Sequence, residues 1–229
     1  MSQPTDVFPP DVRYELEGWD LIWFRLRATG RGDAELGRLT DEIASGVVQA
    51  FASRAPSEDQ VVQAVRKLFR GAGCDPTRYR PSSEALLRRI LKQEALPRIH
   101  PLVDLNNLLS LRLLVPCCVV DPRALAPPLT LRAGRGGEWM DSMRGPFDLE
   151  GKPVLVDSLG SLGTPITDSE RVKIKAGCSE GWMVAYGIQG LCGAEEAAHA
   201  LAALLESAPV ADLLAGPRPN AAGERGTRD

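Results

Sequence analysis

Small, hydroxylated and acidic side chains gather in one short stretch of the sequence, directly after a predicted strand. They are Gly160, Ser161, Gly163, Thr164, Thr167, Asp168 and Ser169. Backbone N–H groups in such a loop could bind a carboxylate or a phosphate, although the stretch lacks the lysine and the glycine spacing of a P-loop. The same residue types are also typical of an elaborate hairpin connection. The spacing alone therefore leaves a binding loop and a simple turn both open.

A second group of polar side chains lies within a strongly apolar segment. If residues 101–114 form a helix, leucine and valine side chains occupy nearly every side of it, so we expect it to be buried. Its polar members are Asp104, Asn106, Asn107 and Ser110. A buried polar group without a partner costs roughly 2–7 kcal/mol, so each of these side chains needs one. We expect Asp104 and Asn107 to bind neighbouring backbone.

Histidine and cysteine offer few candidates for catalysis. His199 lies in an alanine-rich run, and His100 directly precedes Pro101, where helix capping or packing explains it better than a catalytic base does. Adjacent Cys117 and Cys118 are explained as small apolar residues that enter a strand. A small-molecule enzyme that uses either thiol is the alternative, and it depends on their placement alone. Because these residues lack the spacing of a zinc site, we expect no metal and no other cofactor.

Positive charge is concentrated in one part of a chain whose net charge is -3. The basic residues of this part are Arg78, Arg80, Arg88, Arg89, Lys92, Arg98 and Arg112. A solvated helix face explains Arg88, Arg89 and Lys92, whereas a surface that binds a phosphate backbone explains the whole group. Because the overall charge gives no attraction to a polyanion, any contact with nucleic acid has to come from such a local patch.

Hydrophobic periodicity indicates the elements that position these residues. Residues 17–28 alternate as a strand does, and helical spacing extends over 33–54 and 57–70. A further helix begins where Ser82 or Ser83 acts as its cap. After the buried helix, short apolar runs predict strands at PCCVVD, LTLRA, GEWMDS, KPVLVDSLG, RVKIKAG and GWMVAYG. The last predicted helix starts near Gly193 and covers AEEAAHALAALLESAPVADLL.

This order of elements predicts an α+β fold, with a compact mixed or antiparallel sheet and flanking helices. A chain of 229 residues with 44% hydrophobic residues can bury one sizeable core, so we expect a single domain over residues 13–212. Residues 1–12 and 213–229 are rich in proline, glycine and charge and are expected to be flexible tails. The odd number of cysteines, without a leader or a long apolar run, favours a reduced cytoplasmic protein and no membrane span.

The central part of the sequence resembles a known family. The most specific elements are the helix start Arg80-Pro81-Ser82-Ser83-Glu84, the sequence Leu102-Val103-Asp104 with Asn107, and Pro116 followed by Asp121. With GKPVLVDSLGSLGTPITDSERVKI, they are similar to the tRNA-editing domain in the beta subunit of bacterial phenylalanyl-tRNA synthetase. They resemble still more closely the freestanding proteins that consist of this domain alone. The resemblance covers about residues 73–187.

The resemblance implies a cleft between strands and helices, in which the synthetase domain removes tyrosine that is wrongly attached to tRNA in place of phenylalanine. For this chain it implies a deacylase that acts in trans on the charged 3′ end of tRNA. Such hydrolysis requires a positioned water, donors for the oxyanion and a selective pocket. The roles inferred on this basis are catalytic for Gly160, Gly163, Thr164 and Thr167; substrate-binding for Asn107, Cys118, Ser161, Asp168 and Ser169; and tRNA-binding for Arg78, Arg80, Arg88, Arg89 and Lys92.

The sequence departs from the family's pattern at one position. Where the synthetase domain has the histidine of its Gln-Pro-x-His element, the ungapped alignment places Cys118. The change is compatible with another amino-acid substrate, with a new role for the thiol, or with the loss of hydrolysis. A non-catalytic module that binds a tRNA end, or a free amino acid or amino-acid-like ligand, is therefore the alternative to an editing enzyme.

Overall fold

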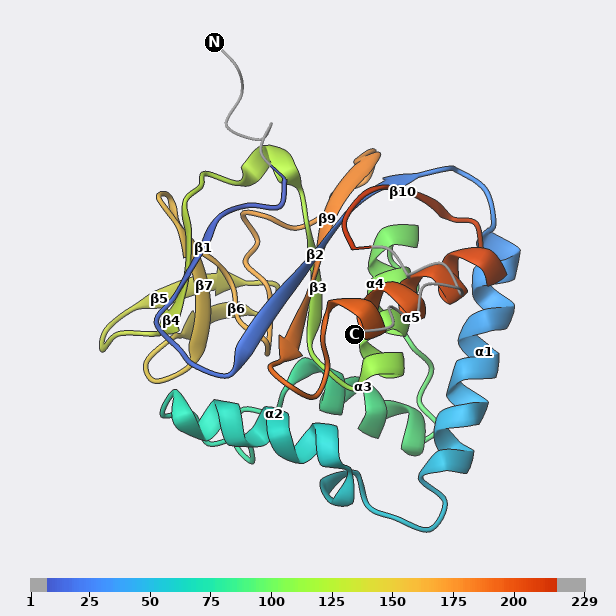
Figure 1. The fold of residues 1–229 in the computed structure, drawn as a ribbon, viewed down its shortest axis with the longest axis horizontal. Coiled ribbons are helices and arrows are strands. Elements are labelled where there is room, and N and C mark those ends of the chain that lie inside the picture. Colours follow the sequence, from blue (N-terminus) through green and yellow to red (C-terminus); the bar gives the residue numbers. More distant parts are fainter. Residues whose placement is uncertain (1–7, 218–229) are drawn as a thin grey trace, which may run out of the picture.

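Residues 8–217 are described by a computed structural model, and they form two four-stranded sheets, a two-stranded hairpin and five α-helices (Figure 1). The α+β class with mixed and antiparallel sheets that the sequence predicts is confirmed. The main core cluster includes side chains from both four-stranded sheets and from all five of these helices. Within residues 8–217, no helix has both the length and the apolar character needed to cross a bilayer.

The larger sheet is antiparallel and has the strand order β10-β2-β9-β3. Its strands are β2 (Trp19–Ala28), β3 (Cys117–Val120), β9 (Glu180–Ile188) and β10 (Ala211–Ala215). The strand predicted over residues 17–28 is confirmed in β2, which pairs with β9 from Trp19 to Arg27. Both faces of β2 carry buried side chains, for example Trp23 and Phe24. The sheet is therefore an internal layer of the molecule.

The second sheet is mixed and has the strand order β1-β4-β7-β8. Its strands are β1 (Val12–Tyr14), β4 (Leu129–Ala133), β7 (Pro153–Asp157) and β8 (Gly160–Gly163), and the hairpin consists of β5 (Trp139–Ser142) and β6 (Gly145–Asp148). β1 runs parallel to β4, and the other pairs are antiparallel. This sheet and the hairpin lie together on one side of the antiparallel sheet (Figure 1).

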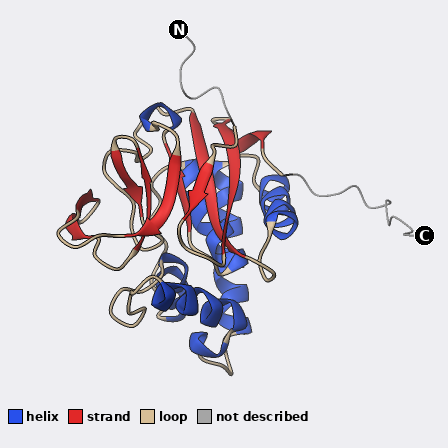
Figure 2. Ribbon diagram, turned by 60° about the vertical axis from the view of Figure 1, so that its left-hand side comes forward, coloured by secondary structure: helices blue, strands red, loops and turns tan. Residues whose placement is uncertain are grey.

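Helices lie on the other side of the antiparallel sheet and below it (Figure 2). They are α1 (Asp33–Ala50), α2 (Gln60–Gly71), α3 (Ser82–Leu91), α4 (Pro101–Leu113) and α5 (Ala194–Ser207). α4 is central, because it packs against β2, β3 and β9 and also against α1, α3 and α5. This position explains why apolar side chains occupy nearly every side of α4.

Two side chains accept hydrogen bonds from backbone N–H groups at the start of α4, as the sequence predicts. The His100 ring nitrogen Nδ1 accepts a hydrogen bond from the Leu102 N–H (3.2 Å), so His100 is the helix cap. Asp104 Oδ1 accepts the Ile99 N–H (2.9 Å), and Asp104 Oδ2 accepts from Arg98 Nε (2.9 Å). The predicted contact of Asp104 with neighbouring backbone is therefore confirmed.

The start of α3 differs from the predicted serine cap, whereas α2 has a side-chain cap. Asp59 caps α2, because its carboxylate accepts the N–H groups of Val61 and Val62. At α3 the cap position belongs to Pro81, and no side chain makes a cap hydrogen bond there. The Ser82 N–H donates instead to the Pro165 carbonyl (2.9 Å), which ties the start of α3 to the loop after β8.

Three predictions about the later part of the chain are wrong. α5 ends at Ser207 with Ala208 extended before Pro209, because proline disfavours a helical conformation in the preceding residue. The residues that follow form β10, whose hydrogen bonds to the edge of β2 replace those of a longer helix. The run RVKIKAG is not a strand and makes only an isolated bridge from Lys173 to Val120. Gly160–Gly163, expected as part of a binding loop or a turn, forms β8 because it pairs with β7.

The boundaries of the two predicted tails also change. Phe8 packs edge-on against Trp182, with ring centroids 5.1 Å apart, and β1 begins at Val12. At the other end, the pairing of β10 with β2 extends to Ala215. The rest of the predicted tails, residues 1–7 and 218–229, lies outside the described residues.

Candidate functional site

A cavity of about 700 Å³ lies where α3, α4, β3, the hairpin and the loop after β8 meet. Its lining comes from residues 78–107, 117–119, 143–147 and 166–174. The side of the cavity formed by α3 and the residues just before it is called the α3 wall. A hydrogen bond from the Ser82 N–H to the Pro165 carbonyl holds this wall against the loop. Segments far apart in the sequence therefore share one concave surface.

Cations dominate the charged residues that line this cavity. The positive side chains are Arg78, Arg80, Arg88, Arg89, Lys92, Arg144 and Lys173, and the carboxylates are Glu94 and Asp168. All the residues predicted to bind tRNA belong to this set. Arg98 and Arg112, the other members of the basic stretch, do not line the cavity. A local surplus of positive charge thus exists in a chain with a net charge of -3.

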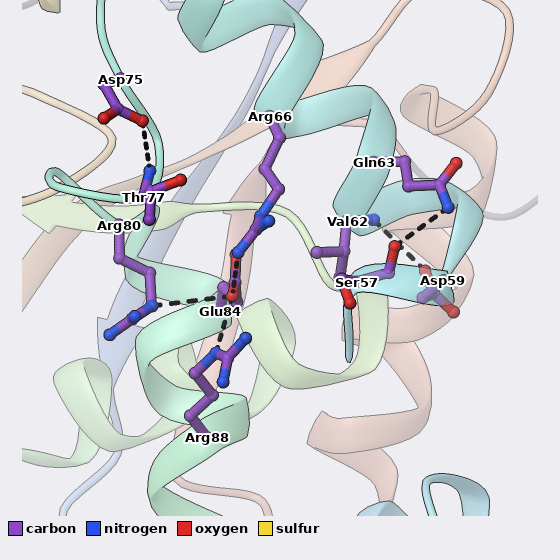
Figure 3. Close-up of polar contacts among 10 residues, drawn as sticks. All are labelled: Ser57, Asp59, Val62, Gln63, Arg66, Asp75, Thr77, Arg80, Glu84 and Arg88. Atoms are coloured by element: carbon purple, nitrogen blue, oxygen red, sulfur yellow. Dashed lines mark hydrogen bonds and ion pairs between the residues drawn. The ribbon is translucent and has the colours of Figure 1, made fainter. Parts of the chain in front are cut away.

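Glu84 organises the α3 wall. Arg66 donates to both of its carboxylate oxygens (2.7 Å each), Arg88 Nε donates at 2.7 Å, and Arg80 Nε lies 3.6 Å away (Figure 3). Burial by itself would raise the pKa of Glu84, but the hydrogen bonds from Arg66 and Arg88 outweigh it and hold the pKa below 4.5. One ionised carboxylate therefore fixes three guanidinium groups and leaves a net positive charge.

Several cations of the lining are free to bind an anion. Within the described residues, Arg78, Lys92 and Arg144 have no carboxylate partner within 4.0 Å. Arg89 donates to the Ala95 carbonyl (2.6 Å) and lies 3.6 Å from Glu94. Arg78, Arg89 and Lys92 lie on α3 or directly beside its ends, and Arg144 lies in the turn of the hairpin.

Both asparagines of α4 line the cavity, and one of them also binds backbone. Asn106 is buried, with 6% of its surface exposed, and its Nδ2 donates to the Cys117 carbonyl (3.2 Å). The predicted contact with backbone is thus made by Asn106 rather than Asn107. Asn106 Oδ1 has no hydrogen-bond partner among the described residues, although Asn106 lines the cavity. Asn107 lines the cavity too. An unpaired buried acceptor at such a surface is available to a ligand.

Asp168 is the acidic group of the loop that reaches the cavity. Burial raises the pKa of its carboxyl to about 7, and a hydrogen bond with Cys118 partly opposes the rise. Burial also raises the pKa of the Cys118 thiol and of the Tyr186 hydroxyl well above their ordinary values. Both groups therefore stay protonated at neutral pH, and Asp168 titrates near neutrality.

Cys118 is buried behind this lining, with 5% of its surface exposed, and does not line the cavity. The Cys118 side chain is therefore not part of the cavity surface. Its thiol contacts Asp168, which does line the cavity.

The two threonines predicted to be catalytic do not line the cavity. Thr164 is buried, and its hydroxyl donates to the Thr167 carbonyl (3.1 Å) while accepting the N–H groups of Ile166 (3.2 Å) and Thr167 (3.0 Å). The hydroxyl of Thr164 is consequently occupied within the loop. Its geometry favours a role in shaping the turn that presents Asp168.

The remaining predicted residues of the loop also lie away from the cavity. The carbonyls of Gly160 (3.3 Å) and Ser161 (3.5 Å) accept from Arg171 Nη2, and the Ser169 hydroxyl accepts the Arg171 N–H (3.2 Å). A Cβ on Gly163 would lie 3.0 Å from Asp168 Oδ1. Of the residues predicted to be catalytic or substrate-binding, the cavity thus brings together Asn107 and Asp168.

Several residues of the cavity have no role assigned from the sequence, among them Asn106, Arg144 and Phe147. For Asn106 a signal existed, because an amide in an otherwise apolar helix needs a partner. For Arg144 and Phe147 no local signal exists, since the hairpin that carries them reaches the cavity only through the tertiary fold.

A second cavity of about 730 Å³ lies between α1 and the segment that joins α3 to α4. Small and apolar side chains such as Gly37, Ala44 and Leu96 line it. Of the basic stretch noted in the sequence, Arg98 belongs to its lining, and the size of this cavity alone does not indicate a function.

Comparison with known proteins bears on this site. The family model described as the B3/4 domain matches residues 64–198, more than half of the chain. No curated protein matches the chain. Among solved structures, it is similar to an N-terminal fragment of the phenylalanyl-tRNA synthetase beta subunit from Pyrococcus horikoshii, with 12% identity and a TM-score of 0.44 over 87% of this chain and 49% of that chain. It is also similar to the TILS C-terminal domain, with 21% identity and a TM-score of 0.28 over 32% of this chain and 71% of that one. The chain spans about half the length of the synthetase fragment.

Proposed function

This chain belongs to the B3/4 domain family, the family of the editing domain of phenylalanyl-tRNA synthetase, and on that premise we propose that it hydrolyses the ester of a mischarged tRNA. It acts in trans, in the cytoplasm, on tRNA that another enzyme has charged. The observation that carries the proposal is the meeting of the basic α3 wall with Asn106, Asn107 and Asp168 in one cavity.

The basic wall supports contact with the 3′ end of tRNA. Lys92 and Arg78 carry charge that no carboxylate of the described residues neutralises, and Arg80 and Arg88 share one carboxylate with Arg66. Guanidinium groups held in place by Glu84 suit phosphate oxygens, because their geometry is set before binding. The phosphates of the single-stranded end thus bind at the rim while the terminal ester enters the cavity.

The interior supports binding of an aminoacyl group. Its apolar lining residues include Val103, Val119, Phe147, Ile166 and Ile174. Asn106 Oδ1 is an unpaired acceptor that suits the α-ammonium group. A volume of about 700 Å³ is within the range of small-molecule sites and accommodates an amino acid joined to a terminal nucleoside.

The direct test measures release of amino acid from a panel of correctly and incorrectly charged tRNAs. We expect selective release by the native protein. A Thr164→Ala, Thr167→Ala double variant should release much less, because the Thr164 hydroxyl bonds that shape the Asp168 loop are lost. Failure of the native protein to release amino acid from any tRNA of the panel would exclude the proposal.

A non-catalytic binding module remains the second candidate, and one observation favours it. No histidine lines the cavity, and the residue aligned with the family's histidine is the buried, protonated Cys118. In that case the protein would bind the charged 3′ end, or a free amino acid, without releasing a product. Binding of a charged tRNA that stays intact over many binding half-lives would distinguish the module from an enzyme.

The affinity for tRNA should depend on Lys92. We expect Lys92→Ala to weaken binding and to lower the slope of log affinity against log salt concentration by about 1, because one phosphate contact is lost. The measurement is tRNA affinity over a series of salt concentrations.

Lys67→Ala is the matched control, since Lys67 is an exposed lysine on α2 that does not line the cavity. Equal salt slopes for the two variants would remove Lys92 from the interface.

A further inference from the structure

We propose that the Asp168 carboxylate is the general base that activates the attacking water in this cavity, an inference that rests on the hydrolysis proposed above. Asp168 is the carboxylate that the loop after β8 presents to the lining. The other carboxylate of the lining, Glu94, lies at the far end of α3 beside Arg89. Asp168 shares this lining with the buried Asn106 and with Cys117, whose carbonyl accepts from Asn106 Nδ2.

The loop holds the Asp168 carboxyl in a defined place. Gly163 and Asp168 form a backbone bridge, and a Cβ on Gly163 would lie 3.0 Å from Asp168 Oδ1, so glycine leaves the room that this oxygen occupies. On the two sides of Asp168, the Thr164 N–H donates to the Thr167 carbonyl (2.9 Å) and the Ser169 N–H donates to the Leu162 carbonyl (3.1 Å). A base held by its backbone in this way needs little reorganisation to meet a water.

The surroundings of the carboxyl suit proton transfer near neutral pH. The titratable groups that face it are Cys118 on β3 and Tyr186 on β9, and both stay protonated because burial raises their pKa. Cations of the same lining are Lys173, Arg144 and the basic residues of the α3 wall. With burial raising its pKa to about 7, Asp168 is a stronger base than an ordinary carboxylate and is still largely ionised above neutrality.

Hydrolysis of the ester then proceeds through a tetrahedral intermediate. The ionised carboxylate takes a proton from water as the water oxygen forms a bond to the ester carbonyl carbon. The tetrahedral intermediate then collapses, the bond from that carbon to the ribose oxygen breaks, and the leaving oxygen takes the proton back from the Asp168 carboxyl. The products are a free amino acid and an uncharged tRNA, and Asp168 returns to its ionised form.

The pH dependence follows from the direction of the pKa shift. The base form of Asp168 exists above the pKa, so turnover should rise with pH through a single step centred near 7 and then level off, after subtraction of spontaneous ester hydrolysis. Removal of the thiol in Cys118→Ala takes away a hydrogen bond that lowers the pKa of Asp168, so this variant should move the step to higher pH. A group with only a structural role would produce neither effect.

The experiment compares the native protein, Asp168→Asn, Asp168→Glu and Cys118→Ala on the tRNA that the native protein deacylates. We expect Asp168→Asn to lower kcat by about 100-fold or more, the usual contribution of a general base. Its affinity for a non-hydrolysable 3′-amide analogue of the same tRNA should stay within a few-fold. Asp168→Glu should keep part of the activity, because a carboxylate is retained.

Two kinds of failure are distinguishable. If the native protein deacylates no tRNA, the proposed function fails and the inference fails with it. If the native protein is active and Asp168→Asn retains its kcat, the inference alone is overturned. If Asp168→Asn does not fold, the pH profile of the native protein is the test. A turnover rate that shows no step near pH 7 overturns the inference. A step whose pH is the same in Cys118→Ala as in the native protein also overturns it.

Discussion

Replacement of Glu84 by alanine is expected to lower the free energy of unfolding by about 3 kcal/mol. Removal of its buried carboxylate leaves Arg66 and Arg88 without the partner to which each donates at 2.7 Å. Loss of one partner from a buried pair costs about 3–5 kcal/mol, and the lower end applies because the guanidiniums keep some contact with solvent. Urea unfolding measures the change. Binding of tRNA should weaken as well, since Glu84 holds Arg80 and Arg88 at the cavity.

The matched control for this prediction is Glu35→Ala, which removes an exposed ion pair with Arg38 on α1. Its expected effect is below about 1 kcal/mol. The pH dependence gives a second check. The folded pKa of Glu84 lies below its ordinary value of 4.5, so its stabilising effect is present above that value and is lost as the pH falls through the folded pKa. The stability difference between native protein and Glu84→Gln should therefore shrink in acid, and a constant difference would contradict the ion-pair explanation.

Replacement of Gly134 by alanine is expected to destabilise the fold by about 3 kcal/mol, at the upper end of the usual cost of overpacking. A Cβ there would lie 1.8 Å from the carbonyl oxygen of Leu149, a fully buried residue, so the backbone has to move. The same stretch carries two backbone hydrogen bonds, from the Gly134 N–H to Lys152 (2.8 Å) and from the Gly151 N–H to Gly134 (3.0 Å). Thermal or urea unfolding reports the loss.

Gly136→Ala is the control for Gly134→Ala, only two residues away. Its added Cβ would meet Glu150 Oε1 at 3.8 Å, an ordinary contact, so stability should stay within about 0.5 kcal/mol. If both variants unfold alike, the close approach of Gly134 to Leu149 is not what holds this part of the fold. Because the hairpin carries Arg144 and Phe147 to the cavity, Gly134→Ala should also reduce tRNA binding.

The local elements were largely predictable from the sequence, and the exceptions have a common cause. Hydrophobic spacing predicts β2 and the helices α1 to α3 because that spacing depends on neighbouring residues alone. The sequence predicts the end of a helix at β10, because only the edge of β2, far away in the sequence, makes ADLLA a strand. The run RVKIKAG shows the opposite effect. Its pattern predicts a strand, but no neighbouring strand pairs with it along its length, so only the isolated bridge of Lys173 forms.

The residues of the candidate site were predictable from the sequence only in part. The amino-acid sequence alone specifies which residue types are present: a basic stretch in an acidic chain, amides and a carboxylate in a buried helix, and an acidic group in a glycine-rich loop. The tertiary fold selects which of them meet, because α3, α4 and the loop after β8 close one cavity only when the sheets have formed. It also decided that Asn106 keeps an unpaired oxygen and that Asp168 titrates near 7, since both depend on the removal of water by distant segments.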